Sequence, residues 1–161
     1  MFGILTRGEV IAHLQNTKDS SQFRRIRDEI EFVVNSSFDN ERTRSEASTE
    51  SISQKRQQLK QWRDEAKVAL GKVISFINKE RIKSKITNSR EFETLTKECE
   101  SCLSEIWLSL TRLLGMADRR LGNWKEKYDY TEAENYKNKA KENYAKLTEK
   151  ITKLIDLVSR I

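Results

Sequence analysis

None of the 161 residues is proline, and only five are glycine. Proline lacks an amide hydrogen and clashes with the preceding helical turn, so its complete absence leaves long helices uninterrupted. Hydrophobic residues make up 36% of the chain and charged residues 35%, a balance typical of amphipathic helices that bury one stripe and solvate the rest. The sequence therefore predicts an all-α fold.

Apolar residues recur every three or four positions in five segments, which we expect to be helices. Their approximate ranges are 7–16, 19–34, 50–83, 89–128 and 131–161. Short connections near 84–89 and 129–131 would make the three long helices antiparallel neighbours. The expected architecture is an elongated antiparallel helical bundle of three long helices plus two shorter N-terminal helices.

Two Thr-x-x-Glu sequences match the capping box that commonly opens a helix. The first runs from Thr6 to Glu9 and the second from Thr131 to Glu134. We therefore expect the first and last helices to begin directly after these threonines.

The segment "DNERTRSEASTES" (39–51) contains a single apolar side chain, Ala47. A segment of this composition cannot bury enough apolar surface to pack, so we interpret 39–49 as a polar linker. The linker divides the chain into an N-terminal helical pair, 1–38, and a three-helix bundle, 50–161, which we expect to form one domain overall.

Basic residues are concentrated in one part of the chain. Residues 54–90 carry 11 basic and three acidic residues, whereas the whole chain has a net charge of +6. Two interpretations remain open for this segment. It is either a surface for nucleic-acid phosphates or a solvated helix face that pairs with carboxylates of the same chain.

Pairing within the chain is expected if the third and fourth helices fold back about a turn near residue 86. Facing residue numbers would then add to about 172. The predicted ion pairs are Lys79–Glu93, Lys72–Glu100 and Lys67–Glu105. Seven of the eight cations left over are the candidate contacts for phosphates of DNA or RNA: Arg56, Lys60, Arg63, Arg81, Lys83, Lys85 and Arg90.

Cys99 and Cys102 form a CxxC sequence, which raises the question of a metal site. Zinc takes about four protein ligands, and the chain offers no second cysteine pair and a single histidine, His13. Both cysteines fall in the apolar stripe of the fourth helix, so we interpret them as core residues. A zinc ion shared between two protomers remains the alternative.

Signatures of catalysis are missing from the sequence. His13 has no orienting carboxylate or nucleophile that the sequence can identify, and no glycine-rich phosphate loop or nucleophile elbow occurs. We therefore expect no enzymatic activity, no cofactor and no small-molecule substrate.

The three tryptophans fall in different positions relative to the apolar stripes. Trp62 and Trp124 lie within stripes, which predicts that they anchor the core. Trp107 directly follows Ile106, beside the stripe, and is the candidate for an exposed or interface aromatic residue.

Membrane insertion and secretion are not expected. No window approaches the ~18 apolar residues of a membrane span, and the opening "MFGIL" is too short for the apolar region of a signal peptide. A cytoplasmic protein is the expectation.

These observations leave three functions open. The first is a non-catalytic helical subunit of a larger assembly, which packs against protein partners and contacts nucleic-acid phosphates through residues 54–90. The second is a protein–protein adaptor or homo-oligomeric coiled-coil scaffold without nucleic-acid binding. The third is a peripheral protein attracted to anionic lipid by the same charges.

Overall fold

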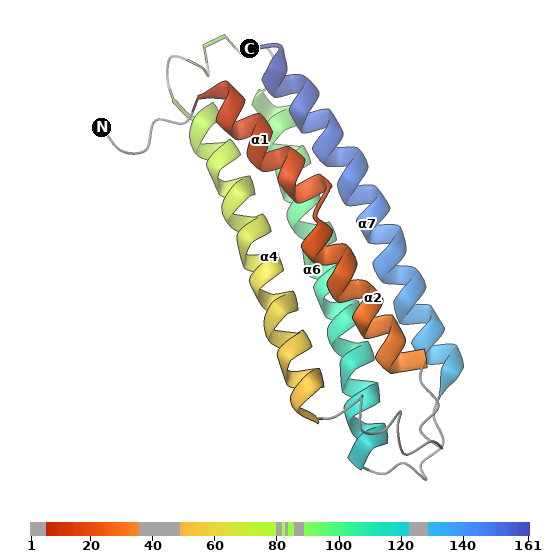
Figure 1. Ribbon diagram of the computed structural model, residues 1–161. Helices are drawn as coiled ribbons and strands as arrows, with labels where there is room; N and C mark the ends of the chain where they lie inside the picture. Colours follow the sequence, from red (N-terminus) through yellow and green to blue (C-terminus); the bar gives the residue numbers. More distant parts are fainter. Residues whose placement is uncertain (1–5, 36–48, 80–81, 83, 86–88, 123–128) are drawn as a thin grey trace. The chain divides into compact units, whose positions relative to one another are not determined.

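The computed structural model describes residues 6–35, 49–79, 82, 84–85, 89–122 and 129–161. Every regular element in these ranges is an α-helix (Figure 1), which confirms the predicted all-α fold class. The helices are α1 (Arg7–Lys18), α2 (Ser21–Asn35), α4 (Thr49–Ile77), α6 (Ser89–Gly122) and α7 (Tyr130–Ser159). Within the described ranges, none of them combines the length and apolar composition that crossing a bilayer requires.

The contacts of the chain divide it into two compact units. Unit 1 comprises Met1–Ser20, Asp64–Ser104 and Asn143–Ile161, and therefore contains α1 with parts of α4, α6 and α7. Unit 2 comprises Ser21–Arg63 and Glu105–Glu142, and contains α2 with the remaining parts of the same three helices. The predicted polar linker, 39–49, lies outside the described residues except for Thr49, with which α4 begins.

In unit 2, α2 packs against α4 through two aromatic rings. The rings of Phe23 and Trp62 are stacked, with centroids 4.2 Å apart and planes inclined by 28°. Further along α2, Glu29 lies 4.0 Å from the ammonium group of Lys55. The position on α4 falls as the position on α2 rises, so these two segments run antiparallel.

In unit 1, α1 is attached to α7 at both ends. The hydroxyl group of Tyr144 donates a 2.9 Å hydrogen bond to the carbonyl oxygen of Lys18. At the other end, the Arg7 guanidinium donates to the carbonyl oxygens of Ser159 and Ile161, at 3.4 and 3.3 Å. Carbonyls at a helix C-terminus lack partners within the helix and attract cations, so Arg7 stabilises the end of α7.

The predicted apolar stripes face the core. Trp62 is only 3% exposed, as predicted for a core anchor, whereas Trp124 lies outside the described residues. Several large side chains have no exposed surface: Leu14, Phe23, Ile26, Ile30, Ile52, Leu59, Leu70, Leu103, Ile106, Leu110 and Leu113. Burial of such side chains is the main favourable contribution to folding, about 1.5–3 kcal/mol for each.

One of the two predicted helix caps is confirmed and the other is wrong. The amide of Glu9 donates to the Thr6 hydroxyl oxygen at 3.2 Å, as the first capping box predicts. The last helix instead begins at Tyr130, because the Asp129 carboxylate accepts the amide hydrogen of Glu132 at 3.0 Å. Asp129 and Glu132 have the same capping-box spacing as Thr131 and Glu134, and an aspartate is at least as good an N-cap as a threonine.

The predicted end of the third helix is also wrong. Helix α4 ends at Ile77 rather than near residue 83. The following sequence "NKER" (78–81) offers no apolar side chain to continue the buried stripe. Beyond it, the amide of Ile82 donates to the carbonyl of Lys79 at 2.9 Å, an i+3 bond tighter than that of an α-helix.

Candidate binding surface on α4 and α6

The predicted register between the third and fourth helices is confirmed in unit 2. Arg56 of α4 lies 3.6 Å from the carboxylate of Asp118 on α6. The guanidinium carbon of Arg63 lies 4.4 Å from the centroid of the Trp107 ring on α6. The residue numbers of these partners add to 174 and 170, close to the predicted 172, so the two segments run antiparallel in the expected alignment.

The individual ion pairs predicted between these helices are wrong where the structure shows another partner. Glu105, predicted to pair with Lys67, lies 3.3 Å from the ammonium group of Lys139 on α7. Among the described residues, no ion pair joins Lys72 to Glu100 or Lys79 to Glu93.

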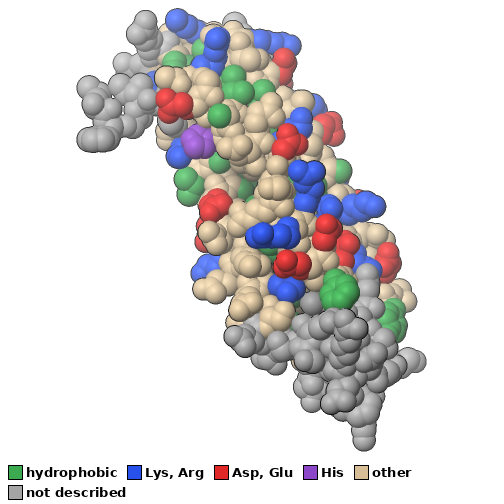
Figure 2. Space-filling view, viewed as in Figure 1, with side chains coloured by type: hydrophobic (Ala, Val, Ile, Leu, Met, Phe, Trp, Pro, Cys, Tyr) green, Lys and Arg blue, Asp and Glu red, His purple; other side chains and the backbone are tan. Residues whose placement is uncertain are grey.

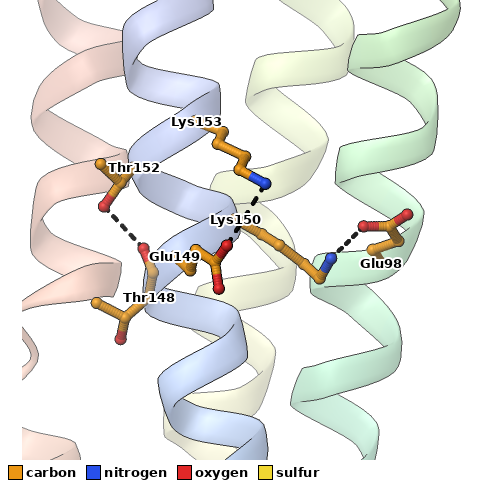
Figure 3. Close-up of polar contacts among 6 residues, drawn as sticks. All are labelled: Glu98, Thr148, Glu149, Lys150, Thr152 and Lys153. Carbon is orange, nitrogen blue, oxygen red and sulfur yellow. Dashed lines mark hydrogen bonds and ion pairs between the residues drawn. The ribbon is translucent and has the colours of Figure 1, made fainter.

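Lysines of α7 pair with carboxylates of α6 in both units. In unit 1 the Lys150 ammonium reaches from α7 to the Glu98 carboxylate on α6, whereas Lys153 pairs with Glu149 at 3.5 Å within α7 (Figure 3). The hydrogen bond that the Lys150 ammonium donates to Glu98 raises the pKa of Lys150 above its ordinary value, against the opposing effect of partial burial. A third helix thus supplies charge partners for the carboxylates of α6.

Three predicted cations form what we call the α4 cation surface, which consists of Arg56, Lys60 and Arg63 in unit 2. Their spacing of four and three residues places them on one face of α4. Lys60 is exposed, and it forms no ion pair with any described residue. The surface therefore presents at least one cation that the described chain does not neutralise.

The other two cations of the surface have partners on α6. The Arg56–Asp118 pair is partly exposed on both sides, at 42% and 36%, so water screens it and its net stabilisation is about 0–1 kcal/mol. Trp107, the interface candidate, is half-buried beneath the Arg63 guanidinium. Such a cation–π contact stabilises by about 0.5–1 kcal/mol and holds the guanidinium flat on the indole.

The four cations predicted at the turn are described only in part. Arg81 and Lys83 lie outside the described residues. Lys85 and Arg90 are exposed and form no ion pair within the described ranges. Both belong to unit 1, whereas the α4 cation surface belongs to unit 2.

Charge is not segregated on the face of the molecule that carries α1 and α2. On the face shown in Figure 2, which carries α1 and α2, basic and acidic side chains are interspersed. On this face the net charge of +6 therefore does not mark a binding site, and we consider the contacts of individual cations instead.

The two cysteines are buried free thiols, as the core interpretation predicts. Burial and the neighbouring Cys102 raise the pKa of the Cys99 thiol to about 12. A thiol with such a pKa is almost entirely protonated at neutral pH, which makes it a poor nucleophile and metal ligand. The described residues include no cluster of three or more side chains of the types that bind metal ions.

Neither the contact of Arg63 with Trp107 nor the exposure of Phe32, both in unit 2, was predicted from the sequence. The stack of Arg63 on Trp107 follows from the register of about 172, which pairs residue 63 with the neighbourhood of residue 109. An exposed phenylalanine, Phe32, lies off the apolar stripe of Phe23, Ile26 and Ile30 on α2, and this displacement is its sequence signal.

Comparison with known proteins adds no relative. No protein-family model, no curated protein and no solved structure gives a significant match to this chain.

Proposed function

We propose that the protein is a non-catalytic α-helical subunit of a larger assembly, which packs against protein partners and contacts nucleic-acid phosphates through residues 54–90. In this proposal the three long and two shorter helices form an antiparallel bundle that holds α4 rigid. The observation that carries the proposal is the α4 cation surface, in which Lys60 has no ion-pair partner among the described residues.

The chemistry of the three cations suits a phosphate backbone. Lys60 offers a mobile ammonium group, which binds phosphate as a point charge. Arg63 is oriented by Trp107, so less side-chain entropy is lost when its N–H groups bind an anion. The ion pair of Arg56 with Asp118 is weak and exposed. A phosphate that accepts two parallel hydrogen bonds from the Arg56 guanidinium can therefore compete with the carboxylate.

Binding of this kind depends on salt and not on base sequence. Each phosphate contact to duplex DNA releases condensed counterions and adds about 0.9 to the slope of log K against log salt. Changing Lys60 to alanine should therefore lower that slope by about 0.9 and weaken binding at all sequences alike. Fluorescence anisotropy with a short labelled duplex, between about 50 and 200 mM salt, measures the slope.

The matched control is Lys141→Ala on α7. Lys141 is also exposed and forms no ion pair among the described residues, so its removal changes the net charge equally. The control should leave the slope unchanged. Equal effects of the two substitutions, or no binding by the unchanged protein, would contradict the proposal.

The alternative is a protein–protein adaptor or homo-oligomeric coiled-coil scaffold without nucleic-acid binding. It is favoured by the exposed Phe32, whose side chain is 58% accessible. Light scattering would show that the mass of a homo-oligomeric scaffold rises with protein concentration. The anisotropy titration would show that such a scaffold binds no nucleic acid at any salt concentration.

A further inference from the structure

A groove in unit 2 lies on α2 and the beginning of α4. Its volume is about 730 Å³, and of the seven described residues that line it, six belong to α2 and the seventh is Lys55 of α4. Ligand-binding clefts commonly enclose a few hundred to about 1,000 Å³. The groove is therefore large enough to receive several side chains of a partner.

An apolar ring forms one wall of this groove. Phe32 is 58% exposed, although other apolar residues of α2 such as Phe23 and Ile26 are fully buried. Exposing a phenyl ring to water is unfavourable, and covering its accessible part would gain free energy in proportion to the area removed from water. Phe32 is thus a potential contact for an apolar side chain.

The charges around the ring have a positive excess. The carboxylate of Asp28 has a cation partner in Arg27 at 3.6 Å, and that of Glu29 has one in Lys55 at 4.0 Å. Arg24 and Arg25, which also line the groove, are exposed and form no ion pair with any described residue. Two guanidinium groups are therefore available to an anionic partner.

A peptide fits this lining better than a nucleic acid does. A phosphate backbone carries a negative charge at every nucleotide, and some of those charges would meet Asp28 and Glu29. A peptide can place carboxylates only opposite Arg24 and Arg25, where each guanidinium can bind a carboxylate with two parallel hydrogen bonds. It can also place an apolar side chain against Phe32.

We propose that this groove binds an acidic segment of a partner protein, with Phe32 contacting an aromatic or aliphatic side chain and Arg24 and Arg25 binding neighbouring carboxylates. The groove is lined by α2 and by Lys55 at the beginning of α4, and none of its lining residues belongs to the α4 cation surface, so the proposal does not depend on nucleic-acid binding.

Selection from a library of random short peptides displayed on phage tests the proposal with the full-length protein. Peptides that also bind the triple variant Arg24→Gln/Arg25→Gln/Phe32→Ala are removed in each round. We expect the remaining peptides to share an aspartate or glutamate pair next to a large apolar residue. Recovery of basic peptides, or of none that distinguish the two proteins, would overturn the proposal.

Single variants then assign the contacts with the best synthetic peptide. Phe32→Ala and the pair Arg24→Gln/Arg25→Gln should each weaken binding at least about tenfold, whereas Phe32→Leu should retain most of it. The control Arg119→Gln, at an exposed arginine of α6 in unit 2, should leave the affinity unchanged. Circular dichroism verifies that the variants, all at exposed positions, remain folded.

Two other occupants have distinct outcomes. If a short oligonucleotide displaces the peptide and the triple variant loses oligonucleotide binding, the groove belongs to a nucleic-acid surface. If the protein self-associates in sedimentation equilibrium and the triple variant does not, the occupant is a second copy of this chain. Either result would overturn the assignment of an acidic partner segment, and neither would decide whether Lys60 binds phosphate.

Discussion

Replacing Phe23 by alanine is expected to lower the free energy of unfolding by about 3–5 kcal/mol. The Phe23 side chain is fully buried, and its ring stacks on Trp62 at 4.2 Å. Removing the ring leaves a cavity between α2 and α4 and also removes an aromatic pair worth about 0.5–1.5 kcal/mol. Because domains are stable by only about 5–15 kcal/mol, urea denaturation followed by circular dichroism should show a large shift of the midpoint.

Phe32→Ala is the matched control because it removes the same side chain from the same helix. Phe32 is 58% exposed, so its replacement should cost no more than about 0.5 kcal/mol. A loss at Phe23 as small as that at Phe32 would mean that α2 does not pack against α4 in solution.

The double charge reversal Lys60→Glu/Arg63→Glu should weaken nucleic-acid binding about a hundredfold or more at about 50 mM salt. At that salt each lost phosphate contact costs about one decade of affinity through counterion release, and the new carboxylates add repulsion. Helicity should be unchanged, because Lys60 is exposed and Arg63 is not part of the buried core. Anisotropy titrations of a labelled oligonucleotide measure the affinity.

The control for net charge is Lys141→Glu/Lys146→Glu on α7. Both lysines are exposed and lack an ion pair among the described residues. Each double variant replaces two cations by two glutamates, so the two variants carry the same net charge. Equal losses of affinity would mean that only the total charge matters, and would remove the α4 cation surface as a site.

Helical periodicity is the part of this fold that could be predicted well. Side chains three and four residues apart share a helix face, so the stripe that includes Leu103, Ile106 and Leu110 identifies the buried face of α6 without knowledge of its neighbours. The register of α4 and α6 was also predictable, because a short connection allows few alignments of two antiparallel helices. Arg63 and Trp107 follow that register.

Ion pairs and caps were harder to predict because several residues compete for each position. A carboxylate on α6 can reach lysines of two neighbouring helices, and Glu105 pairs with Lys139 of α7. At the start of α7, Asp129 lies two residues before Thr131 with the same capping pattern. The partner of Glu105 depends on where a third helix lies, and the N-cap of α7 depends on a small difference in capping energy. Neither can be read from the spacing of residues along the sequence.

The groove on α2 was not predicted for a related reason. Sequence spacing shows that Phe32 is off the apolar stripe, but only the structure shows that Arg24, Arg25 and Lys55 surround it. The positive excess there depends on which carboxylates are already paired, as Asp28 is with Arg27.

The most direct test of the proposed function is a nuclear magnetic resonance titration of the ¹⁵N-labelled protein with a short oligonucleotide. We predict that the largest shifts occur at amides of α4 around Lys60 and at the indole N–H of Trp107, which lies beneath Arg63. The indole of Trp62, only 3% exposed, should remain unchanged as an internal reference. Shifts confined to other helices, with α4 and Trp107 unaffected at saturation, would contradict phosphate binding by the α4 cation surface.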